Sequence, residues 1–505
     1  MKKQISALLA LLMLVPAFAS CSDTNSGEET TTDNNASSGV QETEPEETEW
    51  VDPFAGTDFD GREFRIYTST DTTDATNGDA FIRGSGETNG EIVNDAVFDR
   101  NAYVSELLDI NLTFIESAYA YSAVESSIKK LVMSGADEYD IIANDLYPLA
   151  NLSRDNYVRN VYNSTILDFD QSYWFTEAMR DLQFIEGGMY LLIGDYFTDS
   201  LASCHVLYSN KSMLEDLFGS PEYINDLVFS GKWTLDNMTA ICEATALDTN
   251  GDGQMTEGDR YGFTCIGTWG SAIPFIVGTD IPFISRTDDG ISYSFNTERS
   301  VKILEKLNQV FWNAGSSTSI SEWSALGLRN VFANGQSLMI GYNRLGDLAN
   351  LRDIEFSVGV IPYPKLDEEQ ENYISSMHDT SEIGMIPTTV QESNLDFVYT
   401  CLEVLARETG RRVIPAYYEE ALKVKYVNGQ DDAKMIDLIH DSISTPFPVA
   451  YNNMLGDFLL ATCFANPLGS KNTDFASAYK KGEKAANKLL ERTYASFADC
   501  LMSGN

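Results

Sequence analysis

The alternation of strand-like and helix-like segments near the start of the chain limits the possible folds more than any other sequence feature. Three apolar, strand-like segments are separated by segments of helical apolar spacing, in the order 64–68, 93–108, 112–114, 124–131 and 139–143. Strands that alternate with helices in this way predict a parallel sheet, and so an α/β fold. Such sheets bind ligands at the carboxyl ends of their strands, which here include the loop after Asp71 and Asp145.

A second stretch, residues 231–269, combines a helix start with a metal-loop pattern and a strand. Trp233 and Met238 have the spacing of a hydrophobic staple, with Thr234 between them as the N-cap residue. A helix is therefore expected to begin at Leu235. Beyond the loop, residues 261–264 read YGFT, which indicates a strand.

The loop inside this stretch has the oxygen spacing of a calcium site. Its ligands would stand at the first, third, fifth, seventh and twelfth positions, which are Asp248, Asn250, Asp252, Gln254 and Asp259. The twelfth residue is Asp instead of the longer Glu, and a strand follows in place of a second helix. We interpret the ion as a structural calcium that joins helix to strand. The alternative is a metal-free turn, because Asp, Asn and Gly favour turns without any ion.

Residues 1–20 have the composition of a targeting segment. A basic start precedes an apolar run over 5–15, and small residues lead to Cys21, which resembles a bacterial lipobox. This resemblance implies a signal peptide cleaved before Cys21, which becomes lipidated. The alternative is an ordinary secretory signal cleaved near Ala19. Residues 21–55 are rich in Ser, Thr and acid and predict a disordered tether. The protein is therefore expected on the extracellular face of the cell membrane, attached only by lipid.

The charge of the chain excludes one class of partner. Lys and Arg total 34 against 76 Asp and Glu, which gives a formal net charge of -42. Nucleic acid is not expected to bind, because its phosphates require a basic surface. Six Cys follow Cys21 at wide spacings without a framework pattern, so buried free thiols are expected. The alternative is disulfides, which an even count of Cys outside the cell permits. The three His show no metal-ligand spacing, and no nucleophile elbow or phosphate loop is present.

Several short segments, in order along nearly the whole mature chain, resemble the family 1 extracellular solute-binding proteins, the sugar-type receptors of ABC importers. Besides the lipobox, they are Arg100-Asn101, Tyr208-Ser209-Asn210-Lys211, Gly231-Lys232-Trp233-Thr234, Phe332-Ala333-Asn334-Gly335, and Gly359-Val360-Ile361-Pro362 through Ile386-Pro387.

The resemblance implies a two-lobed periplasmic-binding-protein-like fold of type II, whose lobes close over ligand around a hinge. Lobe 1 would comprise 56–203 and 335–390, and lobe 2 would comprise 204–334 and 391–505. Some members of the family also carry a calcium-type loop in the second lobe.

A carbohydrate site needs flat aromatic rings and polar acceptors for hydroxyl groups. The aromatic candidates are Trp269, Tyr342, Trp174 and Tyr196, whose alternative role is packing. The acceptor candidates are Asp145, Asp195, Asp199 and Asp379, whose alternative is solvated surface. Arg344 is a candidate for a ring oxygen or an acidic sugar, against the alternative of an ordinary ion pair.

We therefore interpret the chain as a monomeric, non-enzymatic receptor that delivers a small polar solute, expected to be an oligosaccharide, to ABC permease subunits. Two alternatives stay open. An extracellular glycosidase needs only two carboxylates at the right separation, which a sequence cannot reveal. A two-lobed adhesion or sensor module would bind a polysaccharide without an importer.

Overall fold

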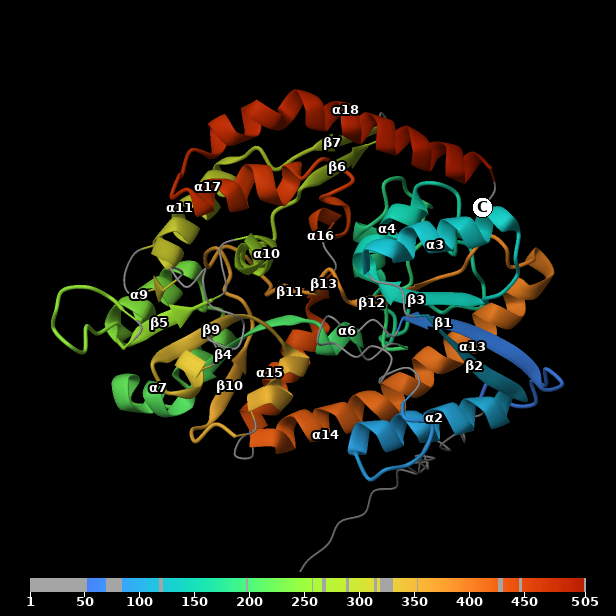
Figure 1. Ribbon diagram of the computed structural model, residues 1–505, viewed down its shortest axis with the longest axis horizontal. Coiled ribbons are helices and arrows are strands. Elements are labelled where there is room, and N and C mark those ends of the chain that lie inside the picture. Colours follow the sequence, from blue (N-terminus) through green and yellow to red (C-terminus); the bar gives the residue numbers. More distant parts are fainter. Residues whose placement is uncertain are drawn as a thin grey trace, which may run out of the picture. The chain divides into compact units, whose positions relative to one another are not determined.

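The computed structural model describes the 505-residue chain over 52–69, 84–117, 121–196, 199–256, 258–265, 269–287, 290–312, 316–317, 330–351, 353–425, 430–444 and 447–503. Two main sheets organise this part of the chain, and helices cover both of them (Figure 1). We call the first sheet with its helices the first lobe, and the second sheet with its helices the second lobe.

The first lobe contains the parallel sheet that the sequence predicts. Its strand order is β12-β3-β1-β2, where β1 (Arg62–Ser69) pairs in parallel with β2 (Ile110–Ser117) and β3 (Ile141–Asp145). The fourth strand, β12 (Glu382–Met385), comes from much later in the chain and pairs antiparallel with β3. The predicted strand and helix order over 64–143 is confirmed, with α2 (Ile92–Leu108) and α3 (Tyr121–Ser134) between the strands.

Helix α2 buries one face against β2 and ends at a left-handed residue. Val97, Val104 and Leu108 are fully buried at the spacing of a helix. Asp109 then takes the left-handed conformation, with φ of 47°, and donates its N–H to the carbonyl of Ser105. Arg100 also lies on the buried face, and burial lowers the pKa of its guanidinium to about 9.

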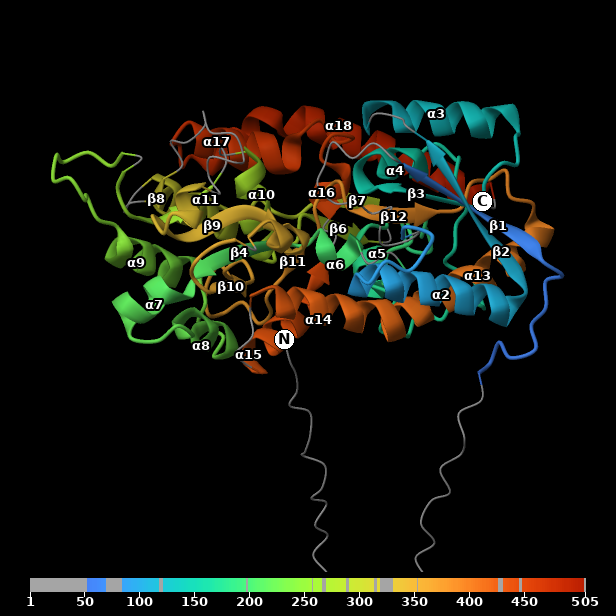
Figure 2. The ribbon, with the colours of Figure 1, turned by 60° about the horizontal axis from the view of Figure 1, so that its bottom comes forward.

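The second lobe is built on a mixed sheet with the order β10-β4-β9-β5-β8. Its strands are β4 (His205–Asn210), β5 (Tyr261–Thr264), β8 (Ser316–Ser317), β9 (Ser337–Arg344) and β10 (Val358–Ile361). Around it lie α7 (Lys211–Phe218), α8 (Tyr223–Phe229), α9 (Leu235–Thr245), α10 (Trp269–Gly278) and α11 (Glu298–Trp312), as Figure 2 shows. Strand β9 is its central strand, antiparallel to β4 and parallel to β5.

The predicted division of the lobes is wrong in two places. Strands β9 and β10 fall within 335–390, assigned to lobe 1, but they pair with strands of the second sheet, and only β12 joins the first. Conversely, α13 (Leu395–Glu408) and α14 (Ile414–Lys425) fall within 391–505 but pack on α2 of the first lobe. Apolar segments in the sequence do not reveal which sheet they join, because both sheets accept buried strands of the same composition.

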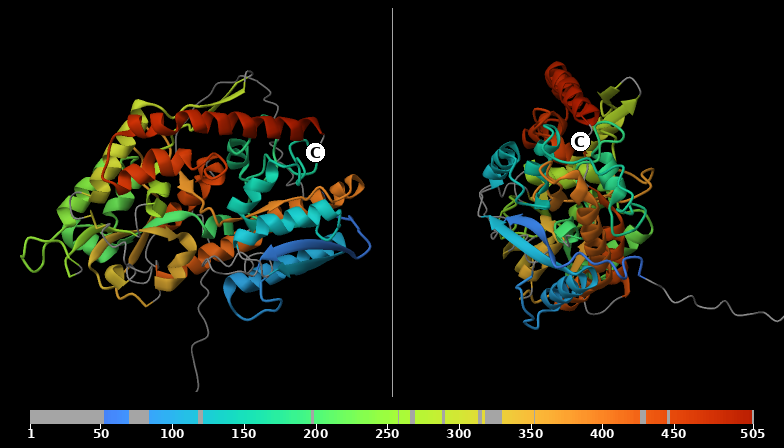
Figure 3. Two further views of the ribbon diagram at one scale, coloured as in Figure 1. Left: turned by 45° about the horizontal axis from the view of Figure 1, so that its top comes forward. Right: turned by 90° about the vertical axis from the view of Figure 1, so that its right-hand side faces the viewer.

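The remaining elements connect or cover the two sheets (Figure 3). They are α4 (Leu146–Ser153), α5 (Thr176–Asp181), α6 (Asp199–Ala202), β6 (Ile284–Thr287), β7 (Gly290–Tyr293), η1 (Leu345–Leu351), β11 (Ser375–Ser376), η2 (Glu392–Asn394), η3 (Thr409–Val413), α15 (Gln430–Asp441), β13 (Ile443–Ser444), α16 (Phe447–Tyr451), η4 (Phe458–Ala465), α17 (Asn466–Gly469) and α18 (Phe475–Met502).

Local predictions on α9 and on the cysteines are confirmed. The helix begins at Leu235, and the Thr234 side chain accepts a hydrogen bond from the N–H of Asn237. Trp233 is fully buried and donates its indole N–H to the carbonyl of Pro362 at 2.9 Å. The six cysteines after Cys21 are free and buried. Among the described residues, the helices are all too short or too polar to cross a membrane.

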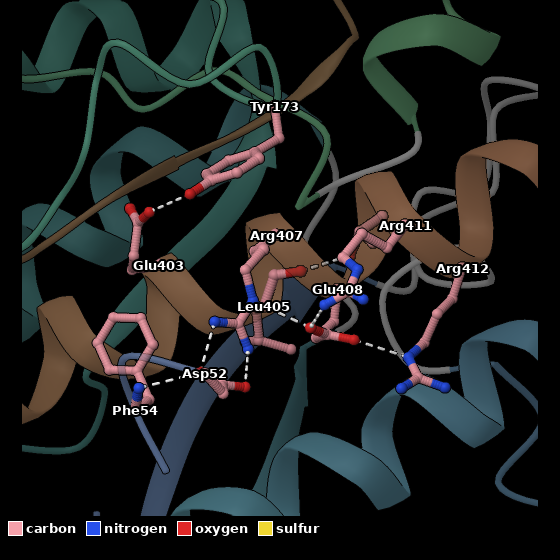
Figure 4. A network of polar contacts seen from close by, with 10 residues as sticks. Asp52, Phe54, Tyr173, Glu403, Leu405, Arg407, Glu408, Arg411 and Arg412 are labelled. Carbon is pink, nitrogen blue, oxygen red and sulfur yellow. Dashed lines mark hydrogen bonds and ion pairs between the residues drawn. The ribbon is translucent and has the colours of Figure 1, made fainter. Parts of the chain in front are cut away.

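The start of the first lobe is fixed to the end of α13 by a charged network (Figure 4). Both carboxylate oxygens of Asp52 pair with Arg407 at 2.8 Å, and Glu408, with no exposed side-chain area, binds Arg407, Arg411 and Arg412. Of the tether predicted over 21–55, residues 52–55 form a turn on the folded unit that begins at Asp52, and the rest lies outside the described residues.

One turn earlier on α13, Glu403 is a buried acceptor for three donors. It receives the indole N–H of Trp174 at 2.9 Å and the backbone N–H of Asp168 at 3.0 Å. It also receives the hydroxyl of Tyr173, as Figure 4 shows. Only 3% of Glu403 is exposed. A buried carboxylate is stable when its oxygens accept several hydrogen bonds, so Glu403 holds segment 168–174 against α13.

We predict that Glu403→Ala lowers the free energy of unfolding by about 3 kcal/mol, because it leaves buried donors without an acceptor. Denaturant unfolding followed by tryptophan fluorescence measures this loss. Glu392→Ala, at an exposed glutamate of η2, is the control and should change it by less than about 0.5 kcal/mol. Equal effects of the two substitutions would show that the Glu403 network contributes nothing to stability.

Candidate functional site

Three segments of the chain meet at one junction, and two of them cross between the lobes. The crossing segments are the start of β4 and residues 377–381, which lead into β12. The third is the end of β9, from which the chain passes through η1 and returns to the second sheet at β10. Leu345 donates its N–H to the carbonyl of Cys204 at 2.9 Å, and His378 donates to the carbonyl of Ser203 at 3.2 Å. The three segments therefore form a hydrogen-bonded junction.

The junction reaches the carboxyl edge of the first sheet through helix α4. The first two N–H groups of this helix, on Leu146 and Tyr147, donate to the carbonyls of Ser381 and Asp379 at 2.8 and 3.0 Å. Asp145, at the end of β3, lies opposite Glu382 in the same ladder. The edge that the sequence predicts as the ligand side thus adjoins the junction.

Arg344 is the cation of the junction. Its side chain is 10% exposed, and its Nη1 lies 3.4 Å from the hydroxyl of Thr380. Asp347 supports it by accepting the Arg344 backbone N–H at 2.9 Å, with the guanidinium Nε at 3.8 Å. The carboxylate of Asp347 holds the end of β9 in place and provides a counter-charge for Arg344.

Asp379 is the more accessible acid of the junction, with 35% of its side chain exposed. Burial raises the pKa of Asp379, but its hydrogen bond with His378 at 2.9 Å and the charge of Arg344 outweigh this and leave the pKa below its ordinary value. The Nδ1 atom of His378 is also 3.1 Å from the N–H of Thr380. A protonated Nδ1 donates to Asp379, whereas an unprotonated Nδ1 accepts from Thr380.

His205 adds a neutral imidazole beneath this pair. It is 4% exposed, and its ring centroid lies 5.0 Å from that of His378. Burial, together with the nearby His378 and Arg344, holds the pKa of His205 well below its ordinary value. The imidazole is therefore uncharged at neutral pH, and Arg344 remains the charged donor near Asp379.

Three of the predicted site residues come together here: Asp145, Asp379 and Arg344. Sequence reasoning missed Tyr147 and His378. Tyr147 is half-buried, and burial and the charges of Asp457, Glu125 and Asp379 raise its pKa. Each missed residue lies within two positions of a predicted acid. This proximity in the sequence could have identified both as site candidates.

Polar atoms also line the carboxyl edge of the first sheet. Among the described residues, Thr68 Oγ1 at the end of β1 and Asn144 Oδ1 at the end of β3 are buried without a hydrogen-bond partner. A buried polar atom without a partner is costly, and a polar ligand would supply the missing bonds. Together with the junction, this edge provides acceptors for hydroxyl groups and a positively charged donor, Arg344.

Two of the predicted aromatic platforms lie in the core. Trp174 is 3% exposed and its indole N–H is bound to Glu403, while Tyr196 is 2% exposed and donates its hydroxyl to Leu192. The two rings pack on each other with centroids 5.3 Å apart. Neither ring can stack on a ligand, because both are buried in the core.

Asp195 also lies apart from the junction. It is 5% exposed, and its carboxylate is 3.2 Å from Nε2 of His440 at the end of α15. Burial raises the pKa of Asp195 against the opposing effect of His440. His440 is in turn bound by Asp441 at 3.3 Å, and its ring packs edge-on against Phe175. This buried pair joins α15 to the first lobe.

Other predicted site residues cannot be placed by their side chains. Trp269 begins α10, Tyr342 lies within β9 and Asp199 begins α6, but their side chains are outside the described structure. The loop after Asp71 falls within 70–83, which is also outside the described residues. Their roles in binding remain predictions.

The calcium-type loop is held by hydrogen bonds to its own backbone. Asp248 accepts the N–H groups of Gly251 and Gly253 at 2.7 and 2.6 Å. Asp259 accepts those of Thr249 and Thr256 at 2.8 and 2.6 Å, which lowers its pKa. Among the described residues, no three acidic, His or Cys side chains gather closely enough to hold a metal ion. The candidate donors of the loop are all oxygens, as calcium prefers.

No protein-family model and no curated protein sequence matches this chain, but solved structures resemble it. An ABC substrate-binding protein from Listeria monocytogenes in complex with cycloalternan is 14% identical, with a TM-score of 0.53, over 86% of this chain and 100% of that one. The GacH receptor of Streptomyces glaucescens, solved unliganded and with acarbose, is 13% identical, with a TM-score of 0.52, over 85% and 99%. A cyclo/maltodextrin-binding protein complexed with maltotetraose is 11% identical, with a TM-score of 0.51, over 87% and 97%.

At identities this low, the likeness establishes the fold. The chain has the two-lobed α/β fold of the ABC solute-binding proteins, which confirms the fold that the sequence predicts. The match spans both lobes, since it covers nearly the full length of each of these structures.

The Asp195–His440 pair predicts a pH dependence of stability. Burial lowers the pKa of His440, but Asp195 and Asp441 raise it more, so its pKa lies above the ordinary value of about 6.5. Its contribution to stability is complete below about pH 6.5 and is lost as the pH rises through the folded-state pKa. His440→Asn should therefore cost more stability at about pH 6 than at about pH 9. Thermal unfolding across this range measures it, and a cost that does not change with pH would contradict the prediction.

Proposed function

We propose that this protein is an extracellular, lipid-anchored receptor of an ABC importer that binds an oligosaccharide between its two lobes. The observation that carries the proposal is the polar cluster of Asp379, His378 and Arg344 at the junction of the three segments. A ligand there can contact the first sheet and the second sheet at once. Only such a ligand favours a closed arrangement of lobes over an open one.

The chemistry of the cluster suits a neutral sugar. The carboxylate of Asp379 accepts from hydroxyl groups, while the guanidinium of Arg344 donates to hydroxyl or ring oxygens. The similar structures from Listeria monocytogenes and Streptomyces glaucescens contain cycloalternan and acarbose, and a third contains maltotetraose. This shared fold supports an oligosaccharide as the ligand. It also supports a receptor, which releases its ligand unchanged, over a glycosidase.

The location is part of the proposal. The lipobox-like sequence before Cys21 and the polar residues up to Val51 would attach the folded unit to the membrane by acyl chains alone. The permease subunits would then receive the ligand from a receptor that remains close to the membrane surface.

We predict that the protein without its lipid anchor binds an oligosaccharide such as maltotetraose at one site per chain. Asp379→Ala should weaken binding by about 10-fold to 100-fold, because a charged hydrogen bond contributes about 1.5–3 kcal/mol. Isothermal titration calorimetry measures both, over a panel of linear and cyclic oligosaccharides. The control is Asp353→Ala, at an exposed acid of the second lobe, which should leave affinity unchanged.

Two results would contradict this function. A folded protein that binds no member of the panel would exclude the carbohydrate ligand, and sugar fragments released during the titration would identify an enzyme. If Asp379→Ala and Asp353→Ala bind equally well, a sugar receptor is retained but the site lies elsewhere.

We further propose that calcium binds the loop from Asp248 to Asp259 and orders it. The oxygen spacing supports this, and each oxygen of Asp248 accepts a single backbone N–H, which leaves a second lone pair for a cation. Asp248, Asn250 and Asp252 would supply side-chain oxygens and Gln254 its carbonyl. Asp259 would have to release a backbone N–H to become the twelfth ligand.

Calcium should therefore raise the unfolding temperature of the protein, and a chelator should reverse the shift. A ligand present at 100 times its Kd stabilises by about 2.7 kcal/mol. Differential scanning calorimetry with calcium, and with magnesium as control, measures the effect. Asp252→Ala should abolish it without changing the metal-free unfolding temperature greatly. An unchanged unfolding temperature in millimolar calcium would favour the metal-free turn.

A further inference from the structure

The last helix, α18, contacts both lobes along its length. Its first half packs on the second lobe, where Phe475 and Tyr479 lie against Phe295 with centroids 6.1 and 5.3 Å away. The hydroxyl of Tyr293 on β7 donates to the carbonyl of Ala486 at 3.3 Å. In Figure 1 the helix runs along the top of the molecule, above α11 and α17 at one end and α3 and α4 at the other.

The second half of α18 packs on a different part of the chain. Phe497 stacks on Phe184 with centroids 4.4 Å apart and an interplanar angle of 13°, and it also contacts Tyr190 at 5.9 Å. Cys500 donates its thiol to the carbonyl of Arg154 at 3.2 Å. Phe497 is 3% exposed, so this contact is part of the core.

The segment under this second half belongs to the first lobe. Leu192 pairs with Gly384 of β12, and Val158 pairs with Pro387 just after that strand. Arg159 donates to the carbonyl of Val390 at 2.6 Å. Because β12 is a strand of the first sheet, we assign the segments that carry Phe184 and Arg154 to the first lobe. From Phe475 to Phe497, α18 therefore joins the two lobes over about 33 Å, at 1.5 Å per residue.

A second contact joins the lobes near the same helix. Arg286 lies on β6, whose partner strand β7 contacts α18 through Tyr293. It donates to the carbonyl of Asp181 at 2.6 Å and to that of Gln183. Its guanidinium lies 5.8 Å from the ring centroid of Phe447 on α16. Strands β6 and β7 lie directly below α18 in Figure 1. The lobes are thus joined here by contacts other than the crossing segments.

We propose that α18 is a brace that sets the spacing of the two lobes in the ligand-free protein. A continuous helix cannot lengthen, so lobes that separate widely must pull Phe497 out of its aromatic pocket and expose that apolar surface to water. The ligand-free protein therefore samples a narrow range of lobe arrangements. A binding site between lobes whose spacing is already fixed needs less rearrangement of the lobes when the ligand binds. This inference does not depend on which solute binds.

Spin labels at Glu106→Cys on α2 and Glu215→Cys on α7 test the brace. Both positions are exposed and lie on different lobes, and the native cysteines after Cys21 are buried and do not compete for label. Double electron–electron resonance on the ligand-free protein should give one narrow distance distribution. Adding Phe497→Ala should broaden it towards longer distances.

The matched control is Phe475→Ala. It removes the same side chain from the same helix, at a residue that is 1% exposed, but its contacts lie within the second lobe. It should leave the distribution narrow although it also lowers stability. If Phe497→Ala does not fold, Phe497→Leu removes the ring stack with less loss of volume. A broad distribution in the unsubstituted protein, or equal broadening by the Phe475 and Phe497 substitutions, would overturn the proposal.

Discussion

Hydrogen bonds between the start of β4, the end of β9 and residues 377–381 hold the two sheets of this protein together. Ser203, Arg344 and His378 belong to these segments, which lie far apart in the sequence. Because α4 donates its first N–H groups to the same junction, the ligand edge of the first sheet is fixed there too. The polar side chains proposed to bind a solute therefore lie at a place where both lobes are within reach.

Local order in the sequence predicted much of the fold. The strands and helices over 64–143, the start of α9 at Leu235 and the strand at 261–264 depend on periodicity and capping between near neighbours. The lobe assignment of later segments failed because it depends on pairing across more than 100 residues. Strands β9 and β12 are both apolar and buried, and only their partners distinguish them.

The site was predicted only in part, and for a similar reason. Asp145 was predicted because it follows a strand, Asp379 because a carboxylate accepts from hydroxyl groups, and Arg344 because it can bind a ring oxygen or an acidic sugar. The structure brings the three together. Trp174 and Tyr196 were misjudged because a sequence does not show that Glu403, over 200 residues later, takes the indole N–H. In a chain with 76 acidic residues, composition cannot distinguish this buried acceptor from a solvated one.

We propose that a solute binds at the junction and contacts both lobes. Hydrogen–deuterium exchange with and without maltotetraose tests it directly, because backbone N–H groups near a bound ligand exchange more slowly. We expect maltotetraose to slow exchange at residues 344–347, at 377–381 and at 145–147 in the same experiment. Protection confined to one lobe, or located away from these segments, would contradict it.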